Sequence, residues 1–299
     1  MKTVVITGSA RGFGFAMAKD FRKYGLNVVI SDINEQNLKK AKQELKQING
    51  EGRILDVVCD VTKSDDLENL YQTAKQNFGA VDIWINNAGV NQPDLPVCML
   101  SESDIDFLLN VDLKGAINGS RIAFKHMVEQ GFGQIYNIEG YGSNDAMKTG
   151  LTIYGTAKRA ITYFTEELAK ECDSHYDDKV LVNRLTPGIM ITDFLTQANG
   201  GKTKVELTEK VKKVYNILGD YPETISAYVV PRMIKNKKNN SKIAWLTKRR
   251  AFGKFFKALF KKNDFFAEKW DSKNFIKIKK SIENDRFFCR FLLKIVVFP

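Results

Sequence analysis

The chain has 299 residues, of which 43% are hydrophobic and 27% charged, and this predicts one large α/β domain with its own core. The four cysteines are widely scattered, and the two histidines, His126 and His175, have no Cys or His partner at ligand spacing. This pattern argues against a disulfide framework and against a metal site. No apolar run reaches the roughly 18 residues of a membrane-spanning helix. A strand pattern begins directly after Met1, so we expect a cytoplasmic protein without a signal peptide.

The net charge of +11 is concentrated at the carboxyl end of the chain. Residues 248–299 contain 15 Lys or Arg and 5 Asp or Glu, which leaves 31 basic and 30 acidic residues for 1–247. The same segment holds 11 of the 20 phenylalanines. We therefore predict two parts, a nearly neutral domain at 1–247 and a basic, phenylalanine-rich extension at 248–299.

The first elements along the chain are a strand, a glycine-rich turn and a helix. Residues 2–7 form an apolar run typical of a buried strand, and Gly8, Gly12 and Gly14 precede an apolar-periodic segment that begins at Phe15. Glycines let the backbone approach a pyrophosphate closely, and the start of a helix offers it unpaired N–H groups. The turn therefore predicts a dinucleotide-binding site.

The residue that ends the second predicted strand bears on which dinucleotide binds. This strand runs from Leu26 to Ser31 and is followed by Asp32, eighteen residues after Gly14. A carboxylate there can accept hydrogen bonds from both ribose hydroxyls and repels a 2′-phosphate, which favours NAD over NADP. Arg11, in the glycine turn, favours the opposite choice because an arginine can bind that phosphate.

Strand and helix patterns alternate over the rest of the first 247 residues. We predict a Rossmann-type doubly wound parallel sheet of about seven strands, with helices on both faces. The predicted strands lie near 3–7, 27–31, 53–59, 81–86, 133–138, 179–185 and 242–246, and the predicted helices near 13–24, 34–48, 65–78, 102–130, 152–174, 204–217 and 223–236.

Tyr154 and Lys158 lie four residues apart in the predicted helix 152–174. That spacing places a phenol and an ammonium on one face of the helix, about a turn apart. A free tyrosine is a poor base at neutral pH because its pKa is about 10. We expect the lysine to favour the phenolate and so lower the pKa of Tyr154, which makes proton exchange with an alcohol or carbonyl feasible.

Taken in order, these motifs resemble those of the short-chain dehydrogenase/reductase family over residues 1–247. The matching motifs are the glycine turn, the Asn-Asn-Ala-Gly segment at 86–89 and the Tyr-x-x-x-Lys pair. The resemblance implies a homodimer or homotetramer. It also implies that a nicotinamide dinucleotide is bound by Thr7, Gly8, Arg11, Gly12, Phe13, Gly14, Asp32, Asp60, Val61, Asn87, Ala88, Gly89, Tyr154, Lys158, Pro187, Gly188 and Thr192.

The resemblance also implies catalytic roles for Asn110 and Ser143. In the family an asparagine kinks a helix and holds a water against the lysine, and we assign Asn110 to this position. The family's serine stands about thirteen residues before the tyrosine, where this chain has Tyr141. Ser143 is the nearest serine, and its Gly-Tyr-Gly-Ser context resembles the chlorophyll b reductase-like branch. Alternatively, Ser143 caps the following loop, and Tyr141 or a backbone N–H orients the substrate.

Together these features predict an oxidoreductase that transfers a hydride between NAD(H) and a secondary alcohol or ketone. Tyr154 would exchange the proton, Lys158 would hold the nicotinamide ribose, and Ser143 would polarise the carbonyl. The alternative is a membrane-associated, NAD-binding scaffold or sensor with little or no turnover, which the displaced serine favours. The presence of Tyr154, Lys158 and Asn110 favours the enzyme.

The extension at 248–299 predicts a basic amphipathic helix. Bulky apolar side chains recur at helical spacing, with lysines among them, in Phe252, Phe255, Phe256, Leu259 and Phe260. This composition is typical of a helix that lies on an anionic membrane surface, so we expect peripheral association with the inner face of a membrane and an apolar substrate. Packing of the same face on the domain or on a second subunit is the alternative. Nucleic acid is not expected, because phenylalanines in one stripe leave few rings for base stacking.

Overall fold

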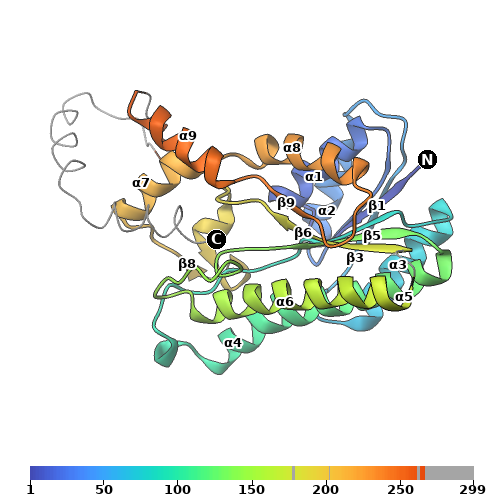
Figure 1. Cartoon of the computed structure of the whole chain (residues 1–299), viewed down its shortest axis with the longest axis horizontal. Helices are drawn as coiled ribbons and strands as arrows, with labels where there is room; N and C mark the ends of the chain where they lie inside the picture. The colour runs from blue at the N-terminus through green and yellow to red at the C-terminus, as the bar shows by residue number, and fades with distance from the viewer. Residues whose placement is uncertain (177–178, 202, 261–262, 267–299) are drawn as a thin grey trace. The chain divides into compact units, whose positions relative to one another are not determined.

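The computed structural model describes residues 1–176, 179–201, 203–260 and 263–266, and a parallel β-sheet forms its centre (Figure 1). The sheet has seven strands in the order β3-β2-β1-β4-β5-β6-β9, with every neighbouring pair parallel. The order reverses between β1 and β4, the point at which open α/β sheets bind their ligands. The strands are β1 (Thr3–Ile6), β2 (Asn27–Asp32), β3 (Ile54–Val58), β4 (Ile83–Asn86), β5 (Gly133–Ile138), β6 (Val180–Thr186) and β9 (Lys242–Ala244).

Helices cover both faces of the sheet (Figure 1). One face packs against α1 (Gly12–Lys23), α2 (Glu35–Lys46) and α8 (Pro222–Lys235), and the other against α3 (Ser64–Phe78), α5 (Ala116–Gln130) and α6 (Thr152–His175). Strands covered on both sides need continuous apolar runs, and Val4, Val5 and Ile6 of β1 are fully buried for this reason. The predicted doubly wound parallel sheet is confirmed.

Residues 102–130, predicted as one helix, form three consecutive helical segments. They are α4 (Glu102–Leu108), a π-helical segment η2 (Leu109–Gly115) and α5. Ser101 begins α4 with a capping box, in which its hydroxyl accepts the Asp104 N–H and the Asp104 carboxylate accepts the Ser101 N–H. A π-helical segment adds a residue to the turn and changes which side chains face inward, and such segments are frequent at functional sites.

Shorter elements, which the sequence did not predict, lie between the main ones. They are the 3-10 turns η1 (Val97–Met99), η3 (Asp193–Leu195) and η4 (Asn199–Gly201), and an antiparallel pair of β7 (Gln197–Ala198) with β8 (Thr203–Lys204). The helix predicted at 204–217 begins later, as α7 (Glu209–Leu218), because Thr208 caps it by accepting a hydrogen bond from the Val211 N–H.

The chain divides into two compact units. The first comprises Met1–Leu207 and Asp220–Trp245 and contains the whole parallel sheet. The second contains α7 and α9 (Lys248–Ala258), and within it the Lys254 ammonium donates to the Gly219 carbonyl at 3.0 Å. The domain boundary at residue 247 stays a prediction, and 267–299, which carries much of the predicted extension, lies outside the described residues.

Over the ranges that the structure describes, every helix is either too short or too polar to cross a bilayer.

Candidate active site

The glycine turn after β1 has a backbone that other residues could not adopt without strain. Gly8 and Gly12 have φ of 60° and 59°, in the left-handed region that favours glycine. A Cβ on Gly8 would lie 2.7 Å from the Ala88 Cα, and one on Gly14 would lie 2.5 Å from the Asn87 amide nitrogen. The turn therefore has to be glycine-rich for the loop after β1 to approach the loop after β4.

Hydrogen bonds join these two loops at the point where the strand order reverses. The Thr7 hydroxyl accepts the backbone N–H groups of Asn87 at 3.0 Å and of Ala88 at 3.1 Å. The Asn87 side-chain amide donates to the carbonyls of Thr7 and Gly8, both at 2.9 Å. The structure thus brings together residues that the sequence predicted as cofactor ligands from positions about eighty apart in the chain.

The start of α1 lies directly behind the turn. Arg11 stands at the N-cap and makes no side-chain capping bond within the described residues, so the first N–H groups of α1 have no side-chain acceptor there. Phe13 contributes its side chain to the buried core, which leaves only its backbone to face a ligand. A helix start with a close-approaching glycine backbone fits a pyrophosphate.

Asp32 is the last residue of β2 and lies next to the glycine turn. Its carboxylate accepts the N–H of Ala10 at 3.4 Å and that of Asn34 at 3.0 Å, so it lies beside the glycine turn. Arg11 is paired differently, with its guanidinium 3.9 Å from the carboxylate of Asp193 and both side chains exposed. The position of Asp32 fits an adenosine ribose whose hydroxyls donate to the carboxylate.

The remaining predicted cofactor residues lie in loops that follow other strands. After β3 the Asp60 carboxylate accepts from the backbone and hydroxyl of Thr62, at 3.0 and 2.7 Å, and Val61 packs against Gly115 of η2. After β6 come Pro187 and Gly188, with Gly188 at φ 76°, and then Thr192 at the N-cap of η3. Their contacts with a cofactor stay a prediction.

Tyr154 and Lys158 are both buried on one face of α6, as their spacing predicted. The Lys158 Nζ lies 5.4 Å from the centroid of the Tyr154 ring. Lys158 acts on the pKa of Tyr154 in the predicted direction, but it does not set the net shift. Burial raises the pKa of Tyr154 above its usual value, Lys158 lowers it and Asp112 raises it, with a net rise. The sequence revealed the spacing of the pair but neither its burial nor the carboxylate beside it.

Asp112, rather than Asn110, is the residue of η2 that contacts Lys158. Its side chain is fully buried, and one carboxylate oxygen lies 2.8 Å from the Lys158 Nζ. The other oxygen accepts the Val90 N–H at 2.7 Å. Burial alone would lower the pKa of Lys158, but the charges of Asp112 and of an ionised Tyr154 outweigh burial and raise that pKa. In the π-helical segment position 112 is buried against α6, and the role of Asn110 in holding a water stays a prediction.

Ser143 anchors the loop after β5 in the structure. Its hydroxyl accepts the Gly140 N–H at 3.1 Å and donates to the Lys158 carbonyl at 3.2 Å, so its bonds are made to backbone. A Cβ on Gly140 would collide with the Tyr154 hydroxyl, so the residue beside that hydroxyl has to be glycine. Tyr141 is partly exposed and donates its hydroxyl to the Met147 carbonyl at 3.0 Å. These contacts match the loop-capping alternative for Ser143.

Gln92 fixes the beginning of α6, and the sequence analysis missed it. Its buried side-chain oxygen accepts the Tyr154 N–H at 2.7 Å, and its amide donates to the Gly150 carbonyl at 2.6 Å. The residue at the N-cap, Leu151, has no side-chain acceptor, so Gln92 satisfies the helix from a distant loop. A position 62 residues earlier in the chain carries no local signal of this kind.

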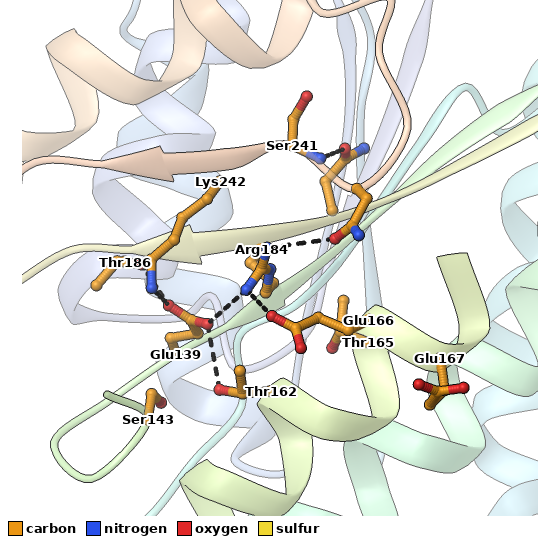
Figure 2. A network of polar contacts seen from close by, with 12 residues as sticks. Glu139, Ser143, Thr162, Thr165, Glu166, Glu167, Arg184, Thr186, Ser241 and Lys242 are labelled. Atoms are coloured by element: carbon orange, nitrogen blue, oxygen red, sulfur yellow. Dashed lines mark hydrogen bonds and ion pairs between the residues drawn. The ribbon is translucent and has the colours of Figure 1, made fainter. Parts of the chain in front are cut away.

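A buried carboxylate, Glu139, follows β5 and binds the neighbouring elements (Figure 2). Its side chain is fully buried. It accepts hydrogen bonds from the Thr162 hydroxyl of α6 at 3.1 Å and from the Thr186 hydroxyl of β6 at 2.6 Å, and the Lys242 ammonium of β9 lies 2.8 Å away. The Lys158 carbonyl lies 3.1 Å from the same Thr162 hydroxyl and shares its one proton, which connects this network to the helix that carries the candidate catalytic pair.

Arg184 of β6 extends the network toward solvent (Figure 2). Its guanidinium lies 3.9 Å from Glu139 and forms a close ion pair with Glu166 of α6. Lys242 and Arg184 therefore offset the carboxylates of Glu139 and Glu166, as a buried charge requires. The network holds the ends of β5, β6 and β9 against α6.

Apolar side chains surround the Tyr154 ring. They form a small cluster separate from the two main cores, with the Phe194 ring centroid 6.0 Å from that of Tyr154. The Asn91 amide donates to the Phe194 carbonyl at 3.1 Å and fixes this residue over the site. The cluster consists of Leu108, Tyr154 and Ala157, with Val90, Leu109, Leu113, Ile153 and Phe194 packed against it.

The sequence is similar to those of known oxidoreductases. The short chain dehydrogenase family model matches residues 2–203. "Chlorophyll(ide) b reductase NOL, chloroplastic" of Oryza sativa subsp. japonica is 32% identical over 274 residues, covering 89% of this chain and 78% of that protein. The Arabidopsis thaliana protein of the same name is 33% identical over 232 residues, covering 77% and 64%. "Probable chlorophyll(ide) b reductase NYC1, chloroplastic" of rice is 32% identical over 262 residues, and this chain spans only 50% of its length.

Solved structures share the fold. A short chain dehydrogenase from Bacillus anthracis superposes with a TM-score of 0.68 and 27% identity, covering 82% of this chain and 94% of that one. A metagenomic short-chain oxidoreductase in complex with NADP has a TM-score of 0.64, covers 82% of this chain and 96% of that one, and is 22% identical, which shows the fold alone.

Replacing Glu139 with glutamine tests the network. Glu139→Gln leaves the size of the side chain nearly unchanged but leaves Lys242 and Arg184 without their shared carboxylate. We expect the free energy of unfolding to fall by about 1–3 kcal/mol, less than for a fully buried pair because Lys242 is 38% exposed. Denaturant unfolding measures this as a lower midpoint with an unchanged slope.

Glu167→Gln is the matched control, because Glu167 lies on α6, the helix that the network contacts, in an exposed pair with Lys170. We expect its effect to stay within about 0.5 kcal/mol. Equal midpoints for the two variants would contradict a stabilising role for Glu139.

Proposed function

Because the chain belongs to the short-chain dehydrogenase/reductase family of oxidoreductases, we propose that it transfers a hydride between NAD(H) and an apolar ketone or secondary alcohol. The observation that carries this proposal is the buried pair of Tyr154 and Lys158 at the carboxyl edge of the sheet. Gly140 lies so close to the tyrosine hydroxyl that a larger side chain at position 140 would collide with it. A phenol in that position can exchange a proton with a substrate oxygen.

Each step of this chemistry has a residue suited to it. The nicotinamide supplies the hydride when the cofactor is bound. The turn from Gly8 to Gly14 and the start of α1 would hold the pyrophosphate, and Asp32 would hold the adenosine ribose. Tyr154 would donate its proton to the carbonyl oxygen in reduction and accept it back in oxidation. Lys158 would orient the nicotinamide ribose and polarise the phenol.

We propose Ser143 as the residue that fixes the loop after β5 on α6. This replaces the idea of a hydroxyl that polarises the carbonyl, because both of its hydrogen bonds are made to backbone atoms. Tyr154 would then be the main hydrogen-bond donor to the substrate oxygen. The substrate would lie against the apolar cluster that includes Leu113 and Phe194.

Two further observations favour an apolar carbonyl substrate. The cluster around Tyr154 offers aliphatic and aromatic side chains, which suit contact with an apolar molecule. The relatives named above are chlorophyll(ide) b reductases, which adds support for reduction of a large apolar molecule. We propose a homodimer or homotetramer as the functional state, because members of the family commonly form oligomers.

A scaffold or sensor that binds NAD without turnover is the rival function. Absorbance at the NADH band, measured with a panel of apolar ketones and alcohols, separates the two. An enzyme consumes or produces NADH with at least one member, whereas the scaffold leaves the absorbance unchanged while cofactor still quenches the tryptophan fluorescence of the protein.

Tyr154→Phe removes the proposed proton donor while keeping the ring. We expect turnover to fall by about a thousandfold, since general acid catalysis contributes about 10²–10⁴. Cofactor affinity should change little. Tyr163→Phe is the control, because Tyr163 lies on the same helix but is 68% exposed, and it should keep wild-type turnover. Near-normal turnover of Tyr154→Phe would overturn the assignment.

The choice of NAD over NADP rests on the Asp32 carboxylate, which repels a 2′-phosphate. We expect Asp32→Asn to lower the preference for NADH over NADPH, expressed as the ratio of kcat/KM values, by about tenfold or more. Glu35→Gln, an exposed carboxylate nearby on α2, is the control and should leave the ratio unchanged. If both variants keep the wild-type ratio, Asp32 does not set the cofactor.

The extension supplies a proposed membrane contact. In α9 and just after it, Phe252, Phe256 and Phe260 recur every fourth residue and are 66%, 59% and 80% exposed. Lys248, Arg249 and Lys257 lie exposed on the same segment. An apolar stripe flanked by cations fits an anionic lipid surface, so we propose a cytoplasmic protein that associates with the inner face of a membrane.

Replacing two of these rings tests the contact. In co-sedimentation with anionic phospholipid vesicles, we expect the full chain with Phe252→Ser and Phe256→Ser to bind about a hundredfold more weakly than wild type, since each buried ring contributes about 1.5–3 kcal/mol. Wild type should bind zwitterionic vesicles weakly. Equal binding of the double variant and wild type to the anionic vesicles would contradict the proposal.

A further inference from the structure

The buried cluster at the candidate site contains three titratable groups. Tyr154 and Lys158 come from α6, and Asp112 comes from η2. The Asp112 and Lys158 side chains are 0% and 8% exposed, and their carboxylate oxygen and ammonium nitrogen lie 2.8 Å apart. At that distance, and away from water, the two charges largely offset each other.

Other charged side chains on or near α6 form pairs away from this cluster. Glu139 binds Lys242 and Arg184, Arg159 binds Asp145, and Lys148 binds Asp94. Over the described residues, the charged groups that shift the pKa of Tyr154 are Lys158 and Asp112, with burial as the larger cause. The state of the tyrosine therefore depends on this one ion pair and on its burial.

The carboxylate of Asp112 changes the net charge of the buried cluster. With Asp112 and Lys158 both ionised, a neutral Tyr154 leaves the cluster uncharged and a tyrosinate gives it one buried negative charge. With an amide in place of the carboxylate, the tyrosinate would instead balance the ammonium. A buried net charge is costly, so the carboxylate disfavours the tyrosinate.

We propose that Asp112 is a positioning residue that offsets the charge of Lys158 and so holds Tyr154 in its protonated form, which prepares the site for carbonyl reduction at neutral pH. This inference rests on the proposed function. In that direction the carbonyl carbon accepts hydride from the reduced cofactor, the carbonyl oxygen accepts the phenolic proton of Tyr154, and solvent returns a proton to the tyrosinate. Alcohol oxidation needs the tyrosinate first and therefore runs at higher pH.

Asp112 also has a structural contact, which the test has to keep constant. One of its oxygens accepts the Val90 N–H at 2.7 Å, and Gly89 lies so close that a Cβ there would be 3.3 Å from the carboxylate. Asparagine has the same shape and keeps one acceptor oxygen, so Asp112→Asn can preserve the contact with Val90 while it removes the charge and places an NH2 group beside Lys158. A purely structural role would leave the titration of Tyr154 unchanged in that variant.

The direct readout is the ionisation of Tyr154, which requires no turnover. Ultraviolet absorbance near the tyrosinate band is recorded against pH for the full chain, and the same titration of Tyr154→Phe is subtracted to isolate residue 154. In wild type we expect the midpoint to lie above the value of about 10 for free tyrosine. A wild-type midpoint near neutrality overturns the proposal without any Asp112 variant.

The second comparison is between the titration midpoints of Tyr154 in wild type and in Asp112→Asn. In Asp112→Asn the midpoint of Tyr154 should move down by about one pH unit or more, because a negative neighbour has been removed. The pH at which alcohol oxidation reaches its plateau should move down with it. Asp112→Glu, which restores the charge, should move the midpoint back up, and Asp94→Asn, which removes a carboxylate from a separate pair, should leave it at the wild-type value.

The outcomes distinguish a failure of the role of Asp112 from a failure of the proposed oxidoreductase function. Equal midpoints in wild type and Asp112→Asn overturn the role of Asp112 even if the enzyme is active. A shifted midpoint without turnover on any carbonyl or alcohol supports the electrostatic role of Asp112 and overturns the proposed function.

Discussion

The ion pair between Asp112 and Lys158 is the interaction on which the candidate site depends. Both groups are buried, so each needs the other, and removing one would leave an uncompensated charge in the interior. Asp112 lies buried in the π-helical segment η2, and Gly89 leaves room beside its carboxylate, since a Cβ there would be 3.3 Å away. This pair provides the charges beside Tyr154 and therefore affects whether its phenol is protonated when a substrate binds.

The rest of the structure holds α6 in place relative to that pair. Gln92 satisfies the N–H of Tyr154 at the start of the helix, and Glu139 binds Thr162 one turn beyond Lys158. Ser143 fastens the loop after β5 to the same helix through the Lys158 carbonyl. These contacts come from separate elements and converge on one helix, so the candidate catalytic groups lie on a rigid support, as preorganised chemistry requires.

Much of the fold was readable from the sequence, because parallel strands buried on both faces appear as continuous apolar runs, and a glycine turn between strand and helix is a local pattern. The pair of Tyr154 and Lys158 was also local. The sequence did not single out Asp112. Asn110 and Asp112 both lie in the π-helical segment, and the sequence does not reveal that this segment forms or that Asp112 is buried in it. The rise in the pKa of Tyr154 was missed because spacing does not report burial. Gln92 acts over 62 residues, beyond any local signal.

A crystal structure of the full chain with reduced cofactor tests the central claim most directly. We predict the pyrophosphate on the turn from Gly8 to Gly14, the nicotinamide ribose within hydrogen-bond reach of Lys158, about 2.6–3.2 Å, and the Asp112 carboxylate still on the ammonium. A cofactor bound elsewhere, or an Asp112 side chain rotated away from Lys158 when the ribose arrives, would contradict the account.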